Sequence, residues 1–301
     1  MGENCPGVSS KDAGKAEECK GCPNVSYCSQ PMQQDPDIKA IQENLGGIRI
    51  IVAIMSGKGG VGKSTITRNI AECISARGVS TCILDLDLSG PSIPRLTATD
   101  GMSMCETNGM MQPVEVNRFL KVVSAGYVQN SYGEGRMFSS RLKTNALKKL
   151  LGHCNYKGVD TLLLDTPPNV TDEHLGMVNF IKPRLGIIVT TPQKFAMQDV
   201  IRQIDFCRKA KIDVLGIVEN MKKFICPSCN HPKSVFRSTG VESYCKSNGV
   251  PYLGSINLRQ DIAKTSDMGN AVRDDAFNRI CDLIISLRET SEVKTTDSFR
   301  Q

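Results

Sequence analysis

Short apolar runs recur along the chain, and each is followed by a turn and a stretch whose apolar residues have helical spacing. Runs this short and this rich in β-branched residues are typical of buried strands in a parallel sheet. Six strands are predicted, at residues 50–55, 81–84, 161–164, 186–191, 214–218 and 252–256. Their alternation with helices favours an α/β fold, with one mostly parallel sheet flanked by helices on both faces.

The clearest helix is predicted at residues 64–77. Ile66, Ile70 and Ile74 recur on one face of this segment, and Gly78 follows where a helix commonly ends. The helix begins directly after a glycine-rich loop, so strand, loop and helix form one continuous unit.

That loop reads GKGGVGKS. Its glycines allow backbone N–H groups to turn toward an anion, and the start of the helix adds partial positive charge. Lys63 is expected to reach the β and γ phosphates of a nucleotide, and the Ser64 hydroxyl to ligate Mg²⁺. The predicted binding residues for ATP and Mg²⁺ are Gly57, Lys58, Gly59, Gly60, Val61, Gly62, Lys63 and Ser64.

Acidic residues follow two of the predicted strands. Asp85 and Asp87 stand in DLDLSGPS, and Asp165 ends a later strand before TPP. Ligands of a parallel sheet bind beyond the carboxyl ends of its strands, so these carboxylates are expected beside the phosphate loop. Asp165 could accept a hydrogen bond from a Mg²⁺-bound water or from Ser64. An aspartate that only caps its own turn is the alternative.

Four of the thirteen cysteines lie near the start of the chain, in the spacing C-x13-C-x2-C-x5-C. No signal peptide is visible, so we expect a reducing compartment in which cysteines are free thiols or metal ligands. Four thiolates suffice for a 4Fe-4S cluster, with zinc as the alternative. The surrounding residues are polar and rich in Gly and Pro, so metal binding is expected to order this segment. The predicted ligands are Cys5, Cys19, Cys22 and Cys28.

Two further cysteines, Cys226 and Cys229, form CPSC after the strand at 214–218. Two thiolates cannot complete a tetrahedral metal site or hold a four-iron cluster. One solution adds His231 and Cys245 to give a zinc site within one chain. The other, which we favour, places two CPSC loops at a two-fold axis, where four thiolates bridge one cluster. The other cysteines sit singly and are predicted to have no chemistry: Cys73, Cys82, Cys105, Cys154, Cys207, Cys245 and Cys281.

The last predicted helix, at residues 275–288, carries an apolar stripe that is typical of core packing. The stripe consists of Phe277, Ile280, Ile284 and Leu287. Residues 289–301 are polar and are expected to fray. No run approaches the roughly eighteen apolar residues of a membrane span, so we expect a soluble intracellular protein without a membrane contact.

Lys58, beside the first glycine of the loop, is not required by the general phosphate-loop pattern. KGGVGKS resembles the deviant Walker A motif of the MinD, ParA, nitrogenase iron protein and Mrp families. Further motifs extend the resemblance over nearly the whole chain: CPGV, AGKAEECKGCPN, DLDLSGPSIP, LLLDTPP, TDEH, TTPQ and the ENM that precedes CPSC. The chain resembles the Mrp/NUBP group of cytosolic iron-sulfur cluster assembly ATPases, specifically the larger paralogues with an N-terminal four-cysteine motif.

Families with this Walker A motif form nucleotide-sandwich dimers, so the resemblance implies that Lys58 contacts the partner's nucleotide. It also implies that Lys63 and Asp165 belong to the catalytic machinery and that Asp87 orients the hydrolytic water. Asn220, which follows the strand at 214–218, would read the adenine base with its amide. A plain turn asparagine is the alternative for this residue.

The resemblance further implies an ATPase, with slow hydrolysis, that assembles 4Fe-4S clusters at a dimer-bridging CPSC site and passes them to cytosolic and nuclear apoproteins. The implied partners are a second copy or a shorter paralogue, acceptor apoproteins and cluster-targeting factors. The implied location is the cytoplasm, with the nucleus as a second. The expected organisation is a cluster-binding segment (1–30), a linker (31–45) that becomes helical near Ile38, the ATPase domain (46–288) and a polar tail (289–301).

Two other functions remain open: a ParA/MinD-like positioning ATPase with structural zinc, and an ATP-dependent iron-sulfur reductase that retains its cluster. The net charge is +6, yet no dense Lys/Arg run is present, so specific nucleic-acid binding is not expected. Two stretches depart from the resemblance. Asn169 and Val170 stand where a glycine is expected after DTPP, and residues 254–269 match the family's leucine-proline-aspartate-proline stretch only loosely.

Overall fold

The computed structural model describes residues 15–21, 25, 37–128, 139–236, 240–272 and 274–297. The chain divides into two units, residues 1–38 and 39–301. The first unit includes one 3-10 turn, η1 (Glu17–Cys19), in which Cys19 is buried. Cys5, Cys22 and Cys28 lie outside the described residues, so the four-cysteine site stays a prediction.

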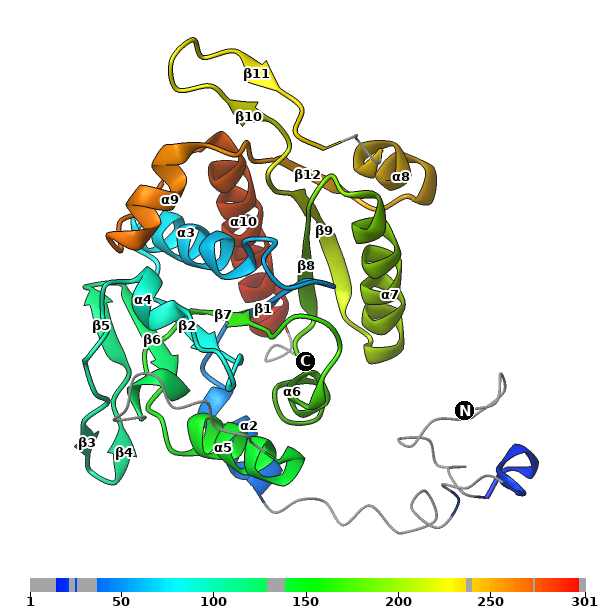
Figure 1. The fold of residues 1–301 in the computed structure, drawn as a ribbon. Helices are drawn as coiled ribbons and strands as arrows, with labels where there is room; N and C mark the ends of the chain where they lie inside the picture. Colours follow the sequence, from blue (N-terminus) through cyan, green and yellow to red (C-terminus); the bar gives the residue numbers. More distant parts are fainter. Residues whose placement is uncertain are drawn as a thin grey trace. The chain divides into compact units, whose positions relative to one another are not determined.

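The second unit contains an eight-stranded sheet in the order β12-β9-β8-β1-β7-β2-β6-β5 (Figure 1). Every neighbouring pair is parallel except β5 and β6. The strands are β1 (Ile50–Met55), β2 (Thr81–Asp85), β5 (Val114–Asn117), β6 (Leu120–Ser124), β7 (Thr161–Asp165), β8 (Leu185–Thr190), β9 (Asp213–Glu219) and β12 (Tyr252–Ser255). Because β1 lies between β8 and β7, the loop that follows it opens at the middle of the carboxyl edge.

All six predicted strands are present, each within one residue of its predicted ends. β5 and β6 were not predicted. They form an antiparallel pair at one edge, and the Asn117 side chain closes their turn by accepting 2.9 Å hydrogen bonds from the N–H groups of Phe119 and Leu120.

Eleven helices and short helical turns surround the sheet among the described residues of the second unit, and two more strand pairs lie outside it. The longer helices are α2 (Asp37–Leu45), α3 (Lys63–Ser75), α5 (Ser140–Gly152), α7 (Lys194–Ala210), α8 (Val241–Asn248), α9 (Gln260–Asp267) and α10 (Asp275–Asp297). The short ones are α4 (Ile93–Leu96), η2 (Ala125–Tyr127), α6 (Asp172–Gly176) and the π-helical η3 (Met177–Ile181). The strand pairs are β3 (Glu106–Thr107) with β4 (Met110–Met111), and β10 (Phe224–Ile225) with β11 (Pro232–Lys233).

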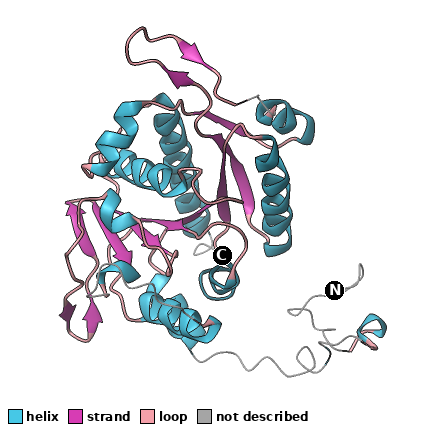
Figure 2. Cartoon of the chain, in the orientation of Figure 1, coloured by secondary structure: helices cyan, strands magenta, loops and turns pink. Residues whose placement is uncertain are grey.

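Apolar side chains alternate across β1. Ile50, Val52 and Ile54 lie in one buried cluster with side chains of α3 and α10. Met55 lies on the opposite face, where its sulfur meets that of Cys207 in α7. Figure 2 shows helices on both sides of the sheet, which confirms the predicted α/β architecture.

The C-terminal end of the second unit differs from the prediction. α10 starts at Asp275 as predicted but extends past Arg288 to Asp297, so the prediction that the chain frays from residue 289 is wrong for that stretch. The stretch includes the helix-favouring residues Glu289, Glu292 and Lys294, and a helix can continue without an apolar face. None of the described helices combines the length and the hydropathy of a membrane span.

The helix expected near Ile38 is α2. Its Ile41 and Leu45 are buried, and the Asn44 side-chain amide donates hydrogen bonds of 2.7 Å to the carbonyl of Leu151 and 2.9 Å to that of Cys154. The last part of the predicted linker therefore packs as part of the second unit.

Candidate functional site

The phosphate loop joins β1 to α3 through positions that require glycine. Gly60 and Gly62 have φ angles of 75° and 83°, in the left-handed region that side chains disfavour. At Gly57 the backbone passes so close to Asp199 of α7 that a Cβ would overlap it. The loop therefore has the backbone that an anion-binding strand-to-helix turn needs.

Asp165, at the end of β7, is the meeting point of polar side chains from the loop and α3. Its Oδ1 lies 2.8 Å from Lys63 Nζ and accepts a 2.7 Å hydrogen bond from Thr67, while its Oδ2 accepts a 2.6 Å bond from Ser64. Lys63 is 7% exposed and Asp165 is fully buried. The predicted residues Lys63, Ser64 and Asp165 are thus brought together. An ammonium beside carboxylate and hydroxyl oxygens suits a Mg²⁺-phosphate complex.

A second carboxyl group lies beside this cluster. β2 pairs with β7 so that Asp85 is in register with Asp165, and the Ser124 hydroxyl donates to Asp85 at 3.1 Å. Burial, and next the charge of Asp165, raise the pKa of Asp85 to about 8. Asp87 lies in the loop beyond the strand, half-buried, and accepts a 3.1 Å bond from the N–H of Gly90. Burial raises the pKa of Asp87 as well.

Lys58 is held by two side chains of α7. Its Nζ lies 3.8 Å from Asp199 Oδ2 and 5.5 Å from the centre of the Phe195 ring. Phe195 is 73% exposed, so the lysine and the ring stand together at the surface. A partly exposed pair of this kind is weak and can exchange for other contacts.

Asn220 packs against the back of the phosphate loop. Its side-chain amide donates a 2.8 Å hydrogen bond to the carbonyl of Val61, and its side-chain oxygen accepts a 3.0 Å bond from the N–H of Met221. A Cβ on Gly62 would overlap this amide. The geometry links the end of β9 to the phosphate loop, while the predicted role of Asn220 toward adenine stays a prediction.

The segment after Asp165 includes Asn169, one of the two residues that stand where the family resemblance leads us to expect a glycine. This residue has a φ of 61°, a region in which glycine is favoured and asparagine is tolerated. The N–H of Thr171 then donates to Nδ1 of His174 at 3.3 Å and caps α6. Burial lowers the pKa of His174 to about 4, and its ring packs edge-on against Phe206 with ring centroids 5.6 Å apart.

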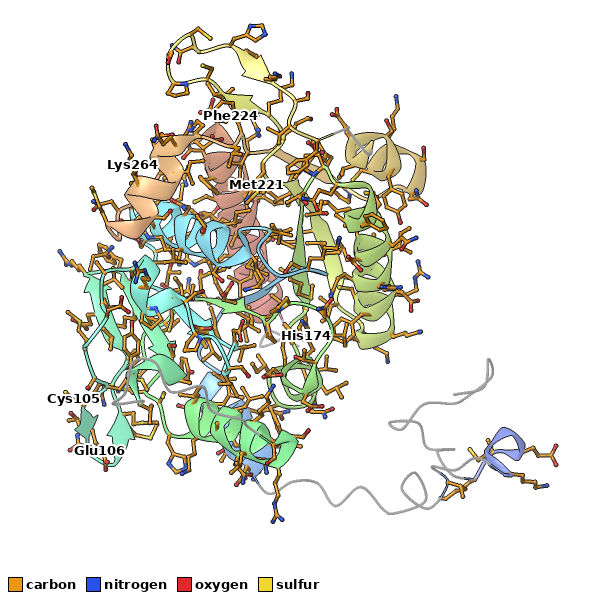
Figure 3. All side chains as sticks on the ribbon, in the orientation of Figure 1. Cys105, Glu106, His174, Met221, Phe224 and Lys264 are labelled. Atoms are coloured by element: carbon orange, nitrogen blue, oxygen red, sulfur yellow. The ribbon has the colours of Figure 1, made fainter. Side chains whose placement is uncertain are left out.

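CPSC forms the turn of the hairpin between β10 and β11. The N–H of Asn230 donates to the carbonyl of Cys226 at 2.8 Å, and the N–H of Cys226 donates to the carbonyl of His231 at 3.2 Å. Asn230 has a φ of 56°, which lets the chain reverse. Phe224 lies at the root of the hairpin (Figure 3).

The turn presents two thiols. Cys226 is half-buried and Cys229 is exposed. N–H groups of Cys229 and Ser228 point at the Cys226 sulfur and hold the pKa of Cys226 below its usual range. Cys245 is buried in α8, and no group of three or more His, Cys, Asp or Glu side chains gathers into a metal site in the described part of the chain. A zinc site from this turn with His231 and Cys245 is therefore not formed here.

Backbone hydrogen bonds fasten the hairpin to the strand ends beside the phosphate loop. The N–H of Lys222 donates to the carbonyl of Ile256 at 3.0 Å, and that of Leu258 to the carbonyl of Lys223 at 2.8 Å. The N–H of Ile225 donates in turn to Leu258 at 3.2 Å. Only a few residues of sequence therefore separate Asn220, which is bonded to the phosphate loop, from the thiols of Cys226 and Cys229.

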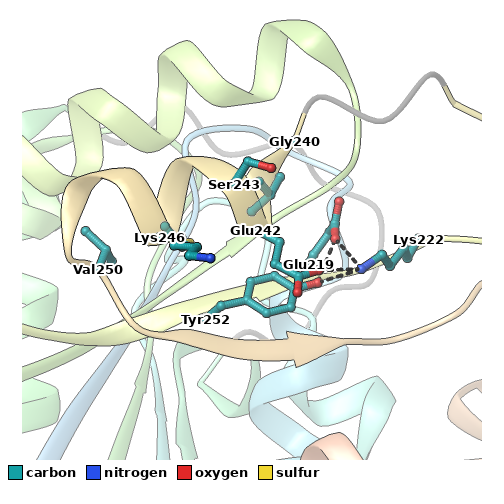
Figure 4. Close-up of a pocket in the computed structure, with 10 residues that line it drawn as sticks. Glu219, Lys222, Gly240, Glu242, Ser243, Lys246, Val250 and Tyr252 are labelled. Atoms are coloured by element: carbon teal, nitrogen blue, oxygen red, sulfur yellow. Dashed lines mark hydrogen bonds and ion pairs between the residues drawn. The ribbon is translucent and has the colours of Figure 1, made fainter.

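A cavity of about 630 Å³ lies between α8 and the ends of β9 and β12 (Figure 4). Tyr252 donates a 2.7 Å hydrogen bond to Glu219, and Lys222 lies 3.4 Å from Glu219 and 3.5 Å from Glu242. Burial, and next the bond to Glu219, raise the pKa of Tyr252 to about 12. These charges pair with one another, so the phosphate-binding geometry belongs to the loop after β1 and not to this cavity.

Two cysteines predicted to sit singly lie together. Arg77 donates to the sulfurs of both Cys73 in α3 and Cys281 in α10, so the prediction that these two cysteines sit singly is wrong. Packing of distant helices, which spacing cannot reveal, brings them together. Cys82, Cys154 and Cys207 are buried, as expected of small apolar side chains.

Several residues that shape the site were not predicted. Thr67 follows Lys63 by one helical turn, a spacing that places both on one face and is a usable signal. Asp199, Phe195 and Ser124 act through contacts across the fold and carry no local signal.

Comparisons with known proteins agree with this geometry. A family model described as the NUBPL iron-transfer P-loop NTPase matches residues 47–286. The cytosolic Fe-S cluster assembly factor NBP35 of Kluyveromyces lactis is 38% identical over 299 residues, which cover 95% of this chain and 92% of that protein. The nucleotide-binding protein of Archaeoglobus fulgidus, in complex with ADP, matches with a TM-score of 0.70 and 32% identity, over 79% of this chain and 95% of that one.

The cell division ATPase MinD of Pyrococcus furiosus matches with a TM-score of 0.57 and 20% identity, over 80% of this chain and 100% of that one, and shares the fold. These matches confirm the resemblance expected from the motifs, and the chain belongs to the NUBPL iron-transfer P-loop NTPase family.

Proposed function

We propose that this protein is an ATP-dependent scaffold that assembles 4Fe-4S clusters and transfers them to apoproteins of the cytosol and nucleus. The observation that carries the proposal is the position of CPSC: two thiols stand at the turn of a hairpin whose root is fastened beside the phosphate loop. The name of the Kluyveromyces lactis relative supports both the activity and the cytosolic location.

The cluster is the cargo of this reaction. Cys226 and Cys229 supply two thiolates, and a four-iron cluster needs more ligands than one chain offers at this turn. A second copy related by a two-fold axis would supply the same two residues, and a shorter paralogue with the same turn could replace it. The working complex is therefore a homodimer or a hetero-oligomer whose cluster is shared between subunits.

The nucleotide side of the proposal uses the cluster around Asp165. Lys63 would neutralise the nucleotide phosphates, and Ser64 and Asp165 would hold Mg²⁺. When bound, Mg²⁺ offsets the charge that develops on the phosphate oxygens. Asp87, in the loop beyond β2, would orient the attacking water, and Lys58 would leave Asp199 to reach the partner's nucleotide.

Asn220 is the proposed link between the two sites. It holds the carbonyl of Val61 in the phosphate loop and starts the segment that leads to the hairpin. Nucleotide binding that changes the position of the loop would change the position of the hairpin root, because the two are joined by this bond. Such coupling requires different contacts in the two nucleotide states.

The N-terminal cysteines complete the proposal. Cys5, Cys19, Cys22 and Cys28 are sufficient in number to hold a second 4Fe-4S cluster within one chain. We assign this cluster to electron entry or partner docking, and the bridging cluster to transfer. Cluster-targeting factors and acceptor apoproteins are the remaining partners.

Cluster transfer to an apo-enzyme tests the proposal. The protein would be loaded anaerobically with iron and sulfide, mixed with an apo-enzyme that needs a 4Fe-4S cluster, and followed by the recovered activity. Wild type should restore activity, the double variant Cys226→Ala/Cys229→Ala should not, and Cys105→Ala, which removes an exposed thiol elsewhere, should behave as wild type. A double variant that donates as well as wild type would overturn the proposal.

A further inference from the structure

We propose that Cys73 and Cys281 form a redox-active dithiol, which a hydroperoxide converts to a disulfide that joins α3 to α10. The two helices pack against each other on one face of the sheet (Figure 1). Cys73 lies in the last turn of α3, Cys281 lies in the second turn of α10, and the same Arg77 nitrogen donates to both sulfurs. The pair shares no residue with the phosphate loop or with CPSC.

Arg77 gives this pair a chemical character that an ordinary buried cysteine lacks. Its Nη1 lies 3.2 Å from Cys73 Sγ and also donates to Cys281 Sγ, while its Nη2 lies 2.9 Å from Asp282 Oδ1. A guanidinium does not lose its proton in proteins, so the positive charge beside the sulfurs is permanent. This charge stabilises a thiolate and opposes a bound metal cation, which favours redox chemistry over metal binding.

The two cysteines differ in solvent exposure, and this difference indicates which of them reacts first with the hydroperoxide. Cys73 is half-buried, whereas Cys281 is fully buried. The groups that face Cys73 are Arg77, Cys281, Asp282 and the neutral side chain of Asn278, which accepts a 3.2 Å hydrogen bond from it. The bond from Cys281, followed by the charge of Arg77, lowers the pKa of Cys73 to about 6, and the same contact raises that of Cys281. At neutral pH, Cys73 is therefore the nucleophile and Cys281 the resolving thiol.

The reaction balances with one hydroperoxide. The Cys73 thiolate attacks one peroxide oxygen, the O–O bond breaks, and the leaving hydroxide or alkoxide takes up a proton. Cys73 is then a sulfenic acid. The Cys281 sulfur attacks the Cys73 sulfur, the S–O bond breaks, and water leaves with the Cys281 proton. The two thiols lose two electrons in total, which reduce the O–O bond.

Peptide mapping of the full chain tests the proposal directly. Cleavage after Lys and Arg releases residues 69–77 and 280–288, each with a single cysteine. The reduced protein would be treated with hydrogen peroxide, blocked with N-ethylmaleimide, digested and analysed by mass spectrometry. We expect a linked peptide that joins these two segments and that dithiothreitol separates. Recovery of both peptides as separate alkylated or over-oxidised species would overturn the proposal.

Variants separate redox chemistry from mere proximity. Cys281→Ala should leave Cys73 as a sulfenic acid that dimedone traps. Arg77→Gln should slow both the linkage and the alkylation of Cys73 at pH 7 by about tenfold or more, because less thiolate is present. Arg208→Gln, an exposed change at the end of α7, should leave both rates unchanged. The disulfide between Cys73 and Cys281 should also form in Cys226→Ala/Cys229→Ala. Failure of the disulfide proposal is therefore distinguishable from failure of the cluster proposal. Equal rates in Arg77→Gln and wild type would contradict the assigned role of Arg77.

Discussion

The side-chain amide of Asn220 donates a hydrogen bond of 2.8 Å to the carbonyl of Val61. Through this bond, the turn after β9 holds the loop in which a nucleotide's phosphates would bind. The same turn continues into the hairpin that carries Cys226 and Cys229. This hydrogen bond therefore connects the phosphate loop to the segment that leads to the proposed cluster site.

We expect Asn220→Ala to weaken ATP binding and to lower the free energy of unfolding by about 1–3 kcal/mol, because the buried carbonyl of Val61 loses its partner. Calorimetric titration with ATP and urea unfolding measure the two effects. Asn248→Ala is the matched control, since Asn248 also donates to a carbonyl, that of Tyr244, but from an exposed position. If the ATP affinity of Asn220→Ala equals that of wild type, the hydrogen bond from Asn220 to Val61 does not support the phosphate loop.

Asp87→Asn should lower the ATP hydrolysis rate by about 100-fold or more if its carboxylate orients the attacking water. ATP affinity should change little, because Asp87 lies outside the cluster of Lys63 and Asp165. Phosphate release and nucleotide titration separate the two effects, with the exposed Asp100→Asn as control. Loss of both ATP binding and ATP hydrolysis would show that Asp87 supports nucleotide binding and does not act only by orienting the attacking water.

Lys58→Gln should abolish nucleotide-dependent dimerisation while the stability of the monomer changes by less than about 1 kcal/mol. In the described part of its own chain, the Lys58 side chain makes the partly exposed contacts with Asp199 and Phe195, which contribute little. Light scattering with a non-hydrolysable ATP analogue measures the association. Dimers that form equally well with Lys58→Gln and with the surface control Lys211→Gln would contradict a role across the interface.

His174 predicts a specific dependence of stability on pH. Burial lowers its pKa from 6.5 to about 4, so the folded state excludes a proton that the unfolded state binds. The contribution of neutral His174 to stability is therefore complete above pH 6.5 and is lost as the pH drops toward 4. Between pH 7.5 and 5, this single group accounts for roughly 2 kcal/mol of the loss.

His174→Gln should flatten that dependence, because glutamine can keep the capping contact with Thr171 but does not titrate. His153→Gln, at an exposed position, should keep the wild-type slope. Urea unfolding at the two pH values measures the difference. An identical slope in His174→Gln and wild type would place the acid sensitivity in another group.

The sequence was sufficient for the parts of the fold that follow local rules. The six predicted strands are short apolar runs, and all except β9 lead directly to a helix. The phosphate loop has a fixed spacing. β5 and β6 were missed because they break this alternation and pair as a hairpin at an edge. Asn169 looked like a departure from the family, yet the structure gives it the left-handed backbone that an asparagine can adopt.

The residues that the sequence could not supply act across the fold. Asp199 and Phe195 reach Lys58 only because α7 packs beside the phosphate loop. Cys73 and Cys281 meet only because α3 and α10 are neighbours in the fold. No periodicity or spacing in one chain encodes such contacts.

The cluster content of the reconstituted protein tests the proposed scaffold function most directly. Iron, sulfide and zinc per chain would be measured together with Mössbauer spectra, in wild type and in Cys226→Ala/Cys229→Ala. We expect the double variant to lose about half a four-iron cluster per chain, since one bridging cluster serves two chains, and to keep the N-terminal cluster. Stoichiometric zinc without sulfide in the wild type would contradict the scaffold function and favour a positioning ATPase.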